Sequence, residues 1–182
     1  MIGIKKIIKT IKSCQHYVAT LQQGINFVEQ LTDQEYGVNI AGKSSPMGTH
    51  VRHIIDHYHS VKSGFTTQVV DYELRKRGSL VETSRQVALA QLVVIQAWIK
   101  SLTEDSLDEI ITVRSDVGMG SCHIIAVKST LARELMFASS HAIHHYAALK
   151  HAYQLLGGKF DDIDFGLASS TATFDKQQCE IS

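Results

Sequence analysis

Cysteine is scarce in this chain of 182 residues, and long hydrophobic runs are missing. Cys14, Cys122 and Cys179 are odd in number and form no Cys-x-x-Cys pair. This pattern argues against a secreted disulfide scaffold and predicts a protein of the reducing cytoplasm. No stretch approaches the roughly 18 consecutive apolar residues of a membrane span, so we expect no membrane partner.

An excess of either charge is also missing, because 18 basic residues balance 18 acidic ones. The balance contains no footprint of nucleic-acid binding, so we expect no nucleic-acid partner. A hydrophobic content of 44% is ordinary for a soluble globular protein and allows a sizeable core. We therefore expect one domain over residues 1–182, with residues 159–182 forming a less regular tail.

Four segments have the apolar periodicity of long helices. The second has a strong start signal, since Ser45 can cap it and Pro46, the only proline, can occupy its first position. Thr83 or Ser84 can cap the third helix, and Gly157 is a suitable stop for the fourth. The predicted helices span about residues 4–31, 46–64, 84–102 and 130–156.

A short β-hairpin is predicted before the last helix. Residues 110–114 are rich in β-branched side chains, and a glycine-containing turn at 118–121 leads to a second segment at 123–127. Such a hairpin is marginal unless it packs on other elements. The sequence thus predicts an all-α fold, an antiparallel four-helix bundle with this hairpin attached. Long connections before the third and fourth helices leave the order of the helices open.

Histidines are concentrated on two of these helices. In the second helix, His50, His53 and His57 form a stripe along one edge of the buried face. His59 falls on the opposite side, where we expect it to be solvated. Asp56 lies one turn after His53 and can hold the second nitrogen of that imidazole.

The last helix contains a second histidine group. His141 and His145 are four residues apart and differ by only about 40° around the helix, the spacing of two ligands to one metal. His144 is rotated about 60° to the other side of His141. Glu134 lies about 10 Å along the axis from His141, so we expect it to pair with a neighbouring basic group instead.

Two facing helices with such histidines can offer three imidazole nitrogens to one divalent ion. Three neutral imidazoles with positions left for water suit zinc, nickel or ferrous iron, and a site of this kind can admit a substrate. Hydrogen-bonded core histidines are the alternative interpretation. Any of His50, His53 and His57 can be the ligand from the second helix.

At these residues the chain resembles the DinB-like superfamily of bacterial four-helix metalloproteins. The resemblance rests on the runs Met47–Tyr58 and Ser140–Tyr146, with Gly157 following. It covers most of the chain and implies a DinB-like four-helix bundle. It also implies that His53, His141 and His145 bind a divalent metal, with His50 and His57 as alternatives in the second helix.

The resemblance further implies an enzyme that uses a low-molecular-weight thiol. We therefore expect a metal-dependent thiol S-transferase or a related detoxification activity on a small-molecule substrate. The alternatives are a metal-dependent hydrolase that activates water, and a non-catalytic stress protein that binds a metal or small ligand. Oligomeric state stays open, with a homodimer through an outer face as one option.

Several side chains are candidates for roles beside the metal. Some can orient a metal ligand or move a proton, and these are Asp56, His57 and His144. Others can hold a cosubstrate carboxylate, although a solvated surface role is favoured for them, and these are Arg52, Arg75 and Arg77.

Overall fold

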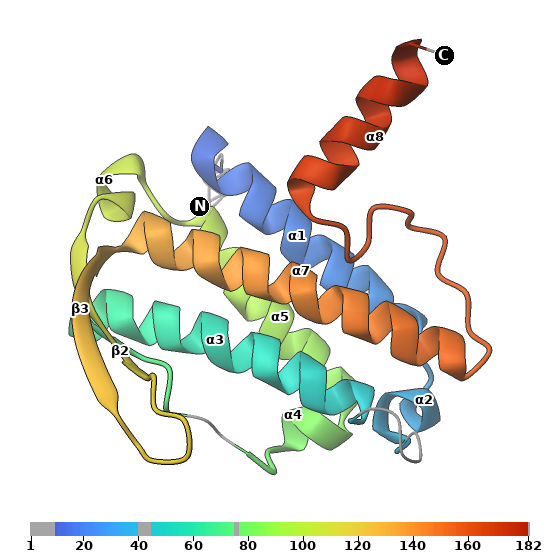
Figure 1. The fold of residues 1–182 in the computed structure, drawn as a ribbon, viewed down its shortest axis with the longest axis horizontal. Coiled ribbons are helices and arrows are strands. Elements are labelled where there is room, and N and C mark those ends of the chain that lie inside the picture. Colours follow the sequence, from blue (N-terminus) through green and yellow to red (C-terminus); the bar gives the residue numbers. More distant parts are fainter. Residues whose placement is uncertain (1–9, 40–44, 75–76, 182) are drawn as a thin grey trace, which may run out of the picture.

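Four long helices form the body of the molecule. The computed structural model describes residues 10–39, 45–74 and 77–181. The long helices are α1 (Lys12–Gln30), α3 (Met47–Thr67), α5 (Arg85–Lys100) and α7 (Leu131–Leu155). They pack side by side as a four-helix bundle (Figure 1), so the predicted all-α fold is confirmed.

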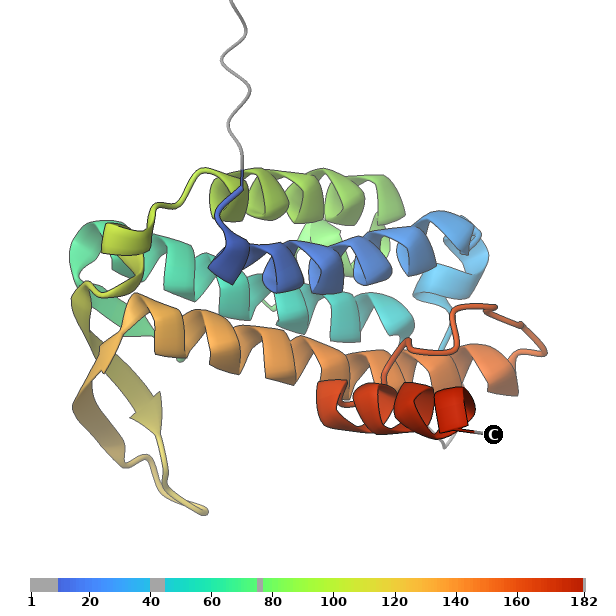
Figure 2. The same ribbon diagram turned by 90° about the horizontal axis from the view of Figure 1, so that it is seen from above.

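The order of the helices differs from a simple alternating bundle. α1 packs against α5 and α7, and α3 packs against the same two helices, so α1 and α3 lie diagonally across the core. Figures 1 and 2 show α1 and α7 running in one direction and α3 and α5 in the other. The expectation of an antiparallel bundle therefore holds for the pairs α1–α5 and α3–α7 only. The connection between α3 and α5 returns the chain to the end of the bundle where α3 began.

The helix boundaries agree with the expected caps in part. The Ser84 hydroxyl accepts from the Val87 amide, and the Thr130 hydroxyl accepts from the Arg133 amide. The second predicted helix starts differently, because Pro46 occupies the cap position and no side chain caps α3. Part of the first predicted helix, residues 4–9, lies outside the described residues, and α1 begins only at Lys12.

Four short or peripheral helices complete the helical part that the structure describes. They are α2 (Asp33–Gly37), α4 (Leu80–Thr83), α6 (Glu104–Leu107) and α8 (Ser169–Ile181). α2 has a capping box between Thr32 and Glu35. Residues 159–182, expected to form a less regular tail, include α8, and residues 159–168 before it form neither helix nor strand. Figure 1 shows α8 extending beyond the bundle.

A three-stranded sheet lies across one end of the bundle. The predicted hairpin is present as β2 (Ile110–Asp116) and β3 (Ile124–Thr130), which pair antiparallel with Val113 opposite Val127. A third strand, β1 (Val69–Asp71), pairs parallel to β2 with Val70 opposite Val113. Because β1 follows α3 directly and packs against it, the sheet holds the hairpin against the bundle.

The core lies between the four long helices. Its largest fully buried side chains come from all four helices, the short helix α2, β2 and the segment before α8: Tyr36, Tyr58, Tyr146, Phe27, Phe165, Leu21, Met47, Ile55, Leu92, Ile95, Ile99 and Ile111. Within the described ranges no helix is long and apolar enough to cross a membrane.

Candidate metal centre

Three histidines of α3 face α7. Val51, Ile54, Ile55, Tyr58 and Val61 anchor α3 in the core. The same helical turns place His50, His53 and His57 along the seam between α3 and α7, because residues three and four apart share a face. His57 is buried, and His50 and His53 are partly buried. The predicted stripe is therefore present.

α7 supplies two further imidazoles to the same seam. Ala138, Ala142 and Leu149 on its buried face pack into the core, and Ala142 lies between His141 and His145 in the chain. The rings of His141 and His145 have centroids 4.6 Å apart. Both side chains are partly buried.

The three residues predicted as metal ligands meet at one point. His141 Nε2 lies 3.0 Å from His53 Nε2 and 3.2 Å from His145 Nε2. One nitrogen from each of the three histidines lies within 4.8 Å of the others. The sequence spacing had predicted the pair on α7 and the family resemblance had favoured His53, and in the structure a nitrogen of His53 lies beside that pair.

The pattern of nitrogen atoms fits an ion better than a chain of hydrogen bonds. A single imidazole nitrogen carries either a proton or one in-plane lone pair. His141 Nε2 therefore cannot make two well-directed hydrogen bonds to His53 and His145 at once. One metal ion would accept all three lone pairs. Two nitrogens bound to a tetrahedral zinc at about 2.0–2.1 Å would lie about 3.3 Å apart, close to the observed spacing.

The electrostatics favour the neutral form of two imidazoles, His145 and His50. Burial, and then the neighbouring imidazoles of His141, His53, His50 and His144, lowers the pKa of His145 to about 3. Burial and the nearby His144 also lower the pKa of His50. Imidazoles that are already neutral near pH 7 offer lone pairs to a metal without first losing a proton.

The other histidines of the seam surround the three converging residues. His50 Nδ1 lies 3.0 Å from His145 Nδ1, on the opposite edge of the His145 ring from Nε2. The His57 ring lies against His141, with centroids 4.2 Å apart. His144 is exposed, and its ring centroid is 5.5 Å from that of His145.

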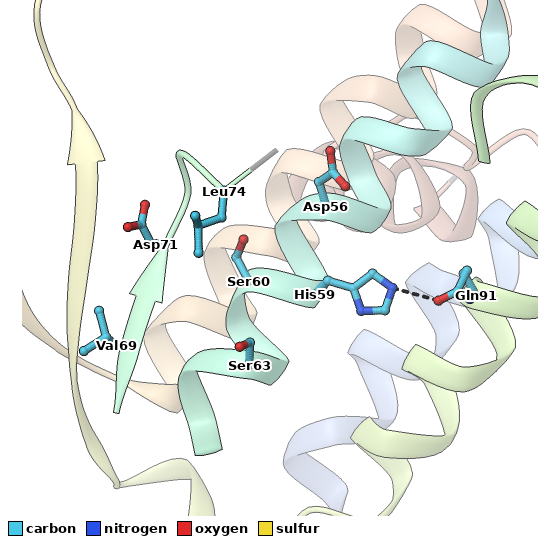
Figure 3. Close-up of a pocket in the computed structure, with 8 residues that line it drawn as sticks. All are labelled: Asp56, His59, Ser60, Ser63, Val69, Asp71, Leu74 and Gln91. Atoms are coloured by element: carbon cyan, nitrogen blue, oxygen red, sulfur yellow. Dashed lines mark hydrogen bonds between the residues drawn. The ribbon is translucent and has the colours of Figure 1, made fainter. Parts of the chain in front are cut away.

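On the opposite side of α3, the expectation of a solvated His59 was wrong. His59 is partly buried, and its Nε2 lies 2.9 Å from Gln91 Oε1 on α5 (Figure 3). Asp56, a candidate to hold His53, accepts a hydrogen bond from Arg52 Nη1 at 2.8 Å. Asp56 and His59 line a separate pocket of about 360 Å³ together with Ser60, Ser63, Val69, Asp71, Leu74 and Gln91.

The basic candidates for a cosubstrate carboxylate do not gather at the cluster. Arg52 is buried and pairs with Asp56 and with Glu82, the latter at 2.9 Å from its Nε. Its guanidinium is thus engaged within the protein. Arg77 is exposed, and Arg75 lies outside the described residues.

A buried carboxylate beside the cluster was only partly anticipated. Glu134 on α7 is fully buried and accepts hydrogen bonds from Arg133, as expected of a basic neighbour, and from Ser129. It also accepts from the Tyr72 hydroxyl at 2.6 Å. The Tyr72 ring lies 5.0 Å from that of His57, so it closes the cluster toward the sheet. Tyr72 stands in a polar connection, and no local pattern marked it.

The fold and the cluster together define a class: four-helix proteins with three histidines converging between two helices. A sequence model of the DinB family matches residues 7–178. The chain therefore belongs to the DinB family. This confirms the resemblance that the two histidine runs indicated.

Two relatives illustrate the similarity. The chain is 30% identical over 162 residues to FK506-binding protein 5 of the fungus Rhizopus delemar, a match that covers 88% of this chain and 37% of that protein. The chain thus spans little more than a third of that relative's length. A DinB-like protein of Bacillus subtilis superposes with a TM-score of 0.56 at 18% identity, covering 82% of this chain and 95% of that chain. This likeness shows the fold, and the fungal relative shows that similarity to this chain is not confined to bacteria.

Proposed function

We propose that His53, His141 and His145 bind one divalent transition metal and that this centre serves the transfer of a small thiol to an electrophile. The metal-binding part is supported by one ring nitrogen from each of these three histidines lying within 4.8 Å of the other two. Membership of the DinB family is compatible with it. The thiol-transfer part extends the family resemblance and is tested separately below.

The donor set determines which ions suit the centre. Three neutral imidazoles with open positions favour zinc, nickel or ferrous iron over magnesium or calcium, which prefer oxygen ligands. A bound ion of this kind would supply Lewis acidity that lowers the pKa of a coordinated thiol. His53 comes from α3 and the other two ligands from α7, so the packing of these helices sets the distances between the nitrogens.

The reaction must dispose of one proton and one leaving group. The thiol loses the proton of its S–H bond, a sulfur–carbon bond forms to the electrophile, and the leaving group departs with its bonding electrons. Among the candidates for moving the proton, His144 is exposed and adjacent to His145, so it can exchange a proton with water. His57 is buried against His141 and is better placed to hold that ring. We assign no role in the reaction to Asp56, because it is engaged with Arg52.

The metal-binding part is tested by elemental analysis of untagged protein purified without a chelator. We expect about one equivalent of a transition metal in the wild type and its loss in His53→Ala, His141→Ala and His145→Ala. His59→Ala is the matched control, because His59 lies on α3 but contacts Gln91. Wild-type protein that holds no metal and takes up none of zinc, nickel or ferrous iron would contradict the proposal.

The thiol-transfer part is tested with cobalt-substituted protein. A thiol that reaches the centre should produce a sulfur-to-cobalt charge-transfer band, and its transfer to an alkylating electrophile should consume both compounds in equal amounts. Turnover that needs water but no thiol would point to the hydrolase instead. A bound metal with neither a thiol signal nor turnover would leave a non-catalytic metal-binding protein.

A further inference from the structure

His145 uses both edges of its imidazole ring. Its Nε2 faces the converging nitrogens, 3.2 Å from His141 Nε2, and its Nδ1 lies 3.0 Å from His50 Nδ1. We infer that His50 is a positioning residue, which accepts a hydrogen bond from His145 Nδ1 and holds His145 in the tautomer whose Nε2 can bind the metal. The inference rests on the proposed metal site and assigns a role within it that the convergence of the three nitrogens does not require.

The direction of this hydrogen bond follows from the chemistry of neutral imidazole. One ring nitrogen carries the proton, and the other carries the lone pair. If His145 Nε2 offers its lone pair to a metal, its proton must be on Nδ1. His50 Nδ1 must then be the acceptor, and His50 carries its own proton on Nε2. Each ring is thus restricted to one of its two tautomers.

The geometry also separates His50 from the ligands. The nitrogen of His50 that touches His145 approaches the edge of the ring that points away from the cluster. His50 is not among the histidines whose nitrogens converge within 4.8 Å. By contrast, the His53 ring lies close to both α7 ligands, with centroids 5.0 Å from His141 and 4.8 Å from His145. The sequence left His50 as an alternative ligand. In this arrangement it instead accepts a hydrogen bond from the ligand His145 and does not bind the metal itself.

The surroundings of His50 suit an acceptor. It is partly buried, and its Nδ1 lies within hydrogen-bonding distance, 3.0 Å, of His145 Nδ1. Partners of this kind commonly change metal affinity 10- to 100-fold when they are removed, because they fix the orientation and basicity of the ligand.

The test compares zinc affinity, measured by competition with a chelator, in His50→Leu and His50→Asn. Leucine fills the space without an acceptor, and we expect it to weaken binding about 10- to 100-fold. The side-chain oxygen of asparagine can take the place of Nδ1, so His50→Asn should recover most of the affinity. His59→Leu is the control, since it removes another partly buried histidine of α3 and should leave the affinity unchanged.

A spectroscopic readout separates positioning from general loss of structure. Nitrogen NMR of the histidine rings in zinc-loaded protein should show His145 protonated at Nδ1 and His50 protonated at Nε2. In His50→Leu, the intensity of the visible bands of cobalt-substituted protein should still indicate the same coordination number. The bands should shift or broaden, because the orientation of the His145 ring becomes less fixed. His50 protonated at Nδ1 would contradict the inference.

The outcomes distinguish this inference from the proposed function. If wild-type protein binds no metal, the proposed function fails and the inference fails with it. If wild-type protein binds metal and His50→Leu binds it equally well, only the inference is overturned. If His50→Leu loses metal as completely as His141→Ala and asparagine restores nothing, His50 is a ligand and the positioning role is wrong.

Discussion

The buried guanidinium of Arg52 forms ion pairs with two carboxylates. Arg52 has a side chain only 9% exposed, and it bridges Asp56 on its own helix and Glu82 on α4. We expect Arg52→Ala to lower the free energy of unfolding by about 3 kcal/mol, because it leaves two shielded carboxylates without their cation. Urea denaturation would measure the loss.

A second arginine provides the matched control for Arg52. Arg114 pairs with Asp71 at 3.2 Å, but its side chain is 49% exposed. Water and salt screen such a pair, so Arg114→Ala should cost about 0–1 kcal/mol. Losses of equal size in Arg52→Ala and Arg114→Ala would contradict the assignment of a buried ion-pair network to Arg52.

For single residues, the sequence predicted which histidines come together better than it predicted the hydrogen-bond partners of the residues around them. The spacing of His141 and His145 was informative because helix geometry is local, and both rings do meet. The pairing of Asp56 with Arg52 was not predicted, although Arg52 lies four residues earlier on the same helix face and offers a full positive charge. The contact between His50 and His145 depends on how α3 crosses α7, which no local pattern contains.

At the scale of elements, one glycine sets how closely β1 approaches α3. A methyl group added at Gly64 would lie 2.9 Å from the Val70 backbone, so the strand would have to move. We expect Gly64→Ala to destabilise the protein by about 1–3 kcal/mol, measured by thermal or urea unfolding. Gly37→Ala is the control, because among the described residues no other part of the fold lies within 4 Å of a methyl group there. Equal stability of the two variants would show that β1 does not need this close approach.

The turn of the hairpin has a carboxylate that should make its order depend on pH. Asp116 accepts from the amides of His123 and Gly118, and these hydrogen bonds lower its pKa in the folded protein. A lowered folded pKa means that the carboxylate stabilises the turn at neutral pH and that this contribution is lost as the pH falls below about 4. Amide exchange at Gly118 and His123 should therefore accelerate in acid relative to the intrinsic rate.

A single substitution separates this effect from general acid unfolding. In Asp116→Asn the turn should be less protected at neutral pH, and the additional acid-dependent loss at these two amides should disappear. Amides of α1 serve as the internal reference, because α1 lies away from the hairpin (Figure 2). The same acid-dependent loss in both proteins would mean that another group controls the turn.

The elements of the fold were predicted with unequal success, for a physical reason. Long amphipathic helices and the β-branched strand β2 carry their own periodicity, and both were predicted. β1 spans only Val69–Asp71 and exists through its pairing with β2, so its own sequence gives little signal. The residues of α8 are mostly polar and include few apolar side chains to mark a buried face, which explains why this segment was expected to be less regular.

For the whole molecule, the centre joins two helices that are far apart in the sequence. His53 lies on α3, and His141 and His145 lie on α7, which follows α5 and the three-stranded sheet. The unfolded chain cannot hold these three imidazoles within a few ångströms of one another without a large loss of conformational entropy. A metal bound by all three should therefore bind the folded state far better than the unfolded state.

This coupling predicts that a suitable metal stabilises the whole fold. Free zinc at about 100 times its dissociation constant should add about 2.7 kcal/mol to the free energy of unfolding. For a protein of this size, such a gain raises the melting temperature by about 5–10 °C. Differential scanning calorimetry would measure the shift, and a chelator should reverse it. In His141→Ala the shift should vanish, because only two of the three nitrogens remain. A shift of the same size in that variant would mean that the ion binds elsewhere in the molecule and that the seam between α3 and α7 is not its site.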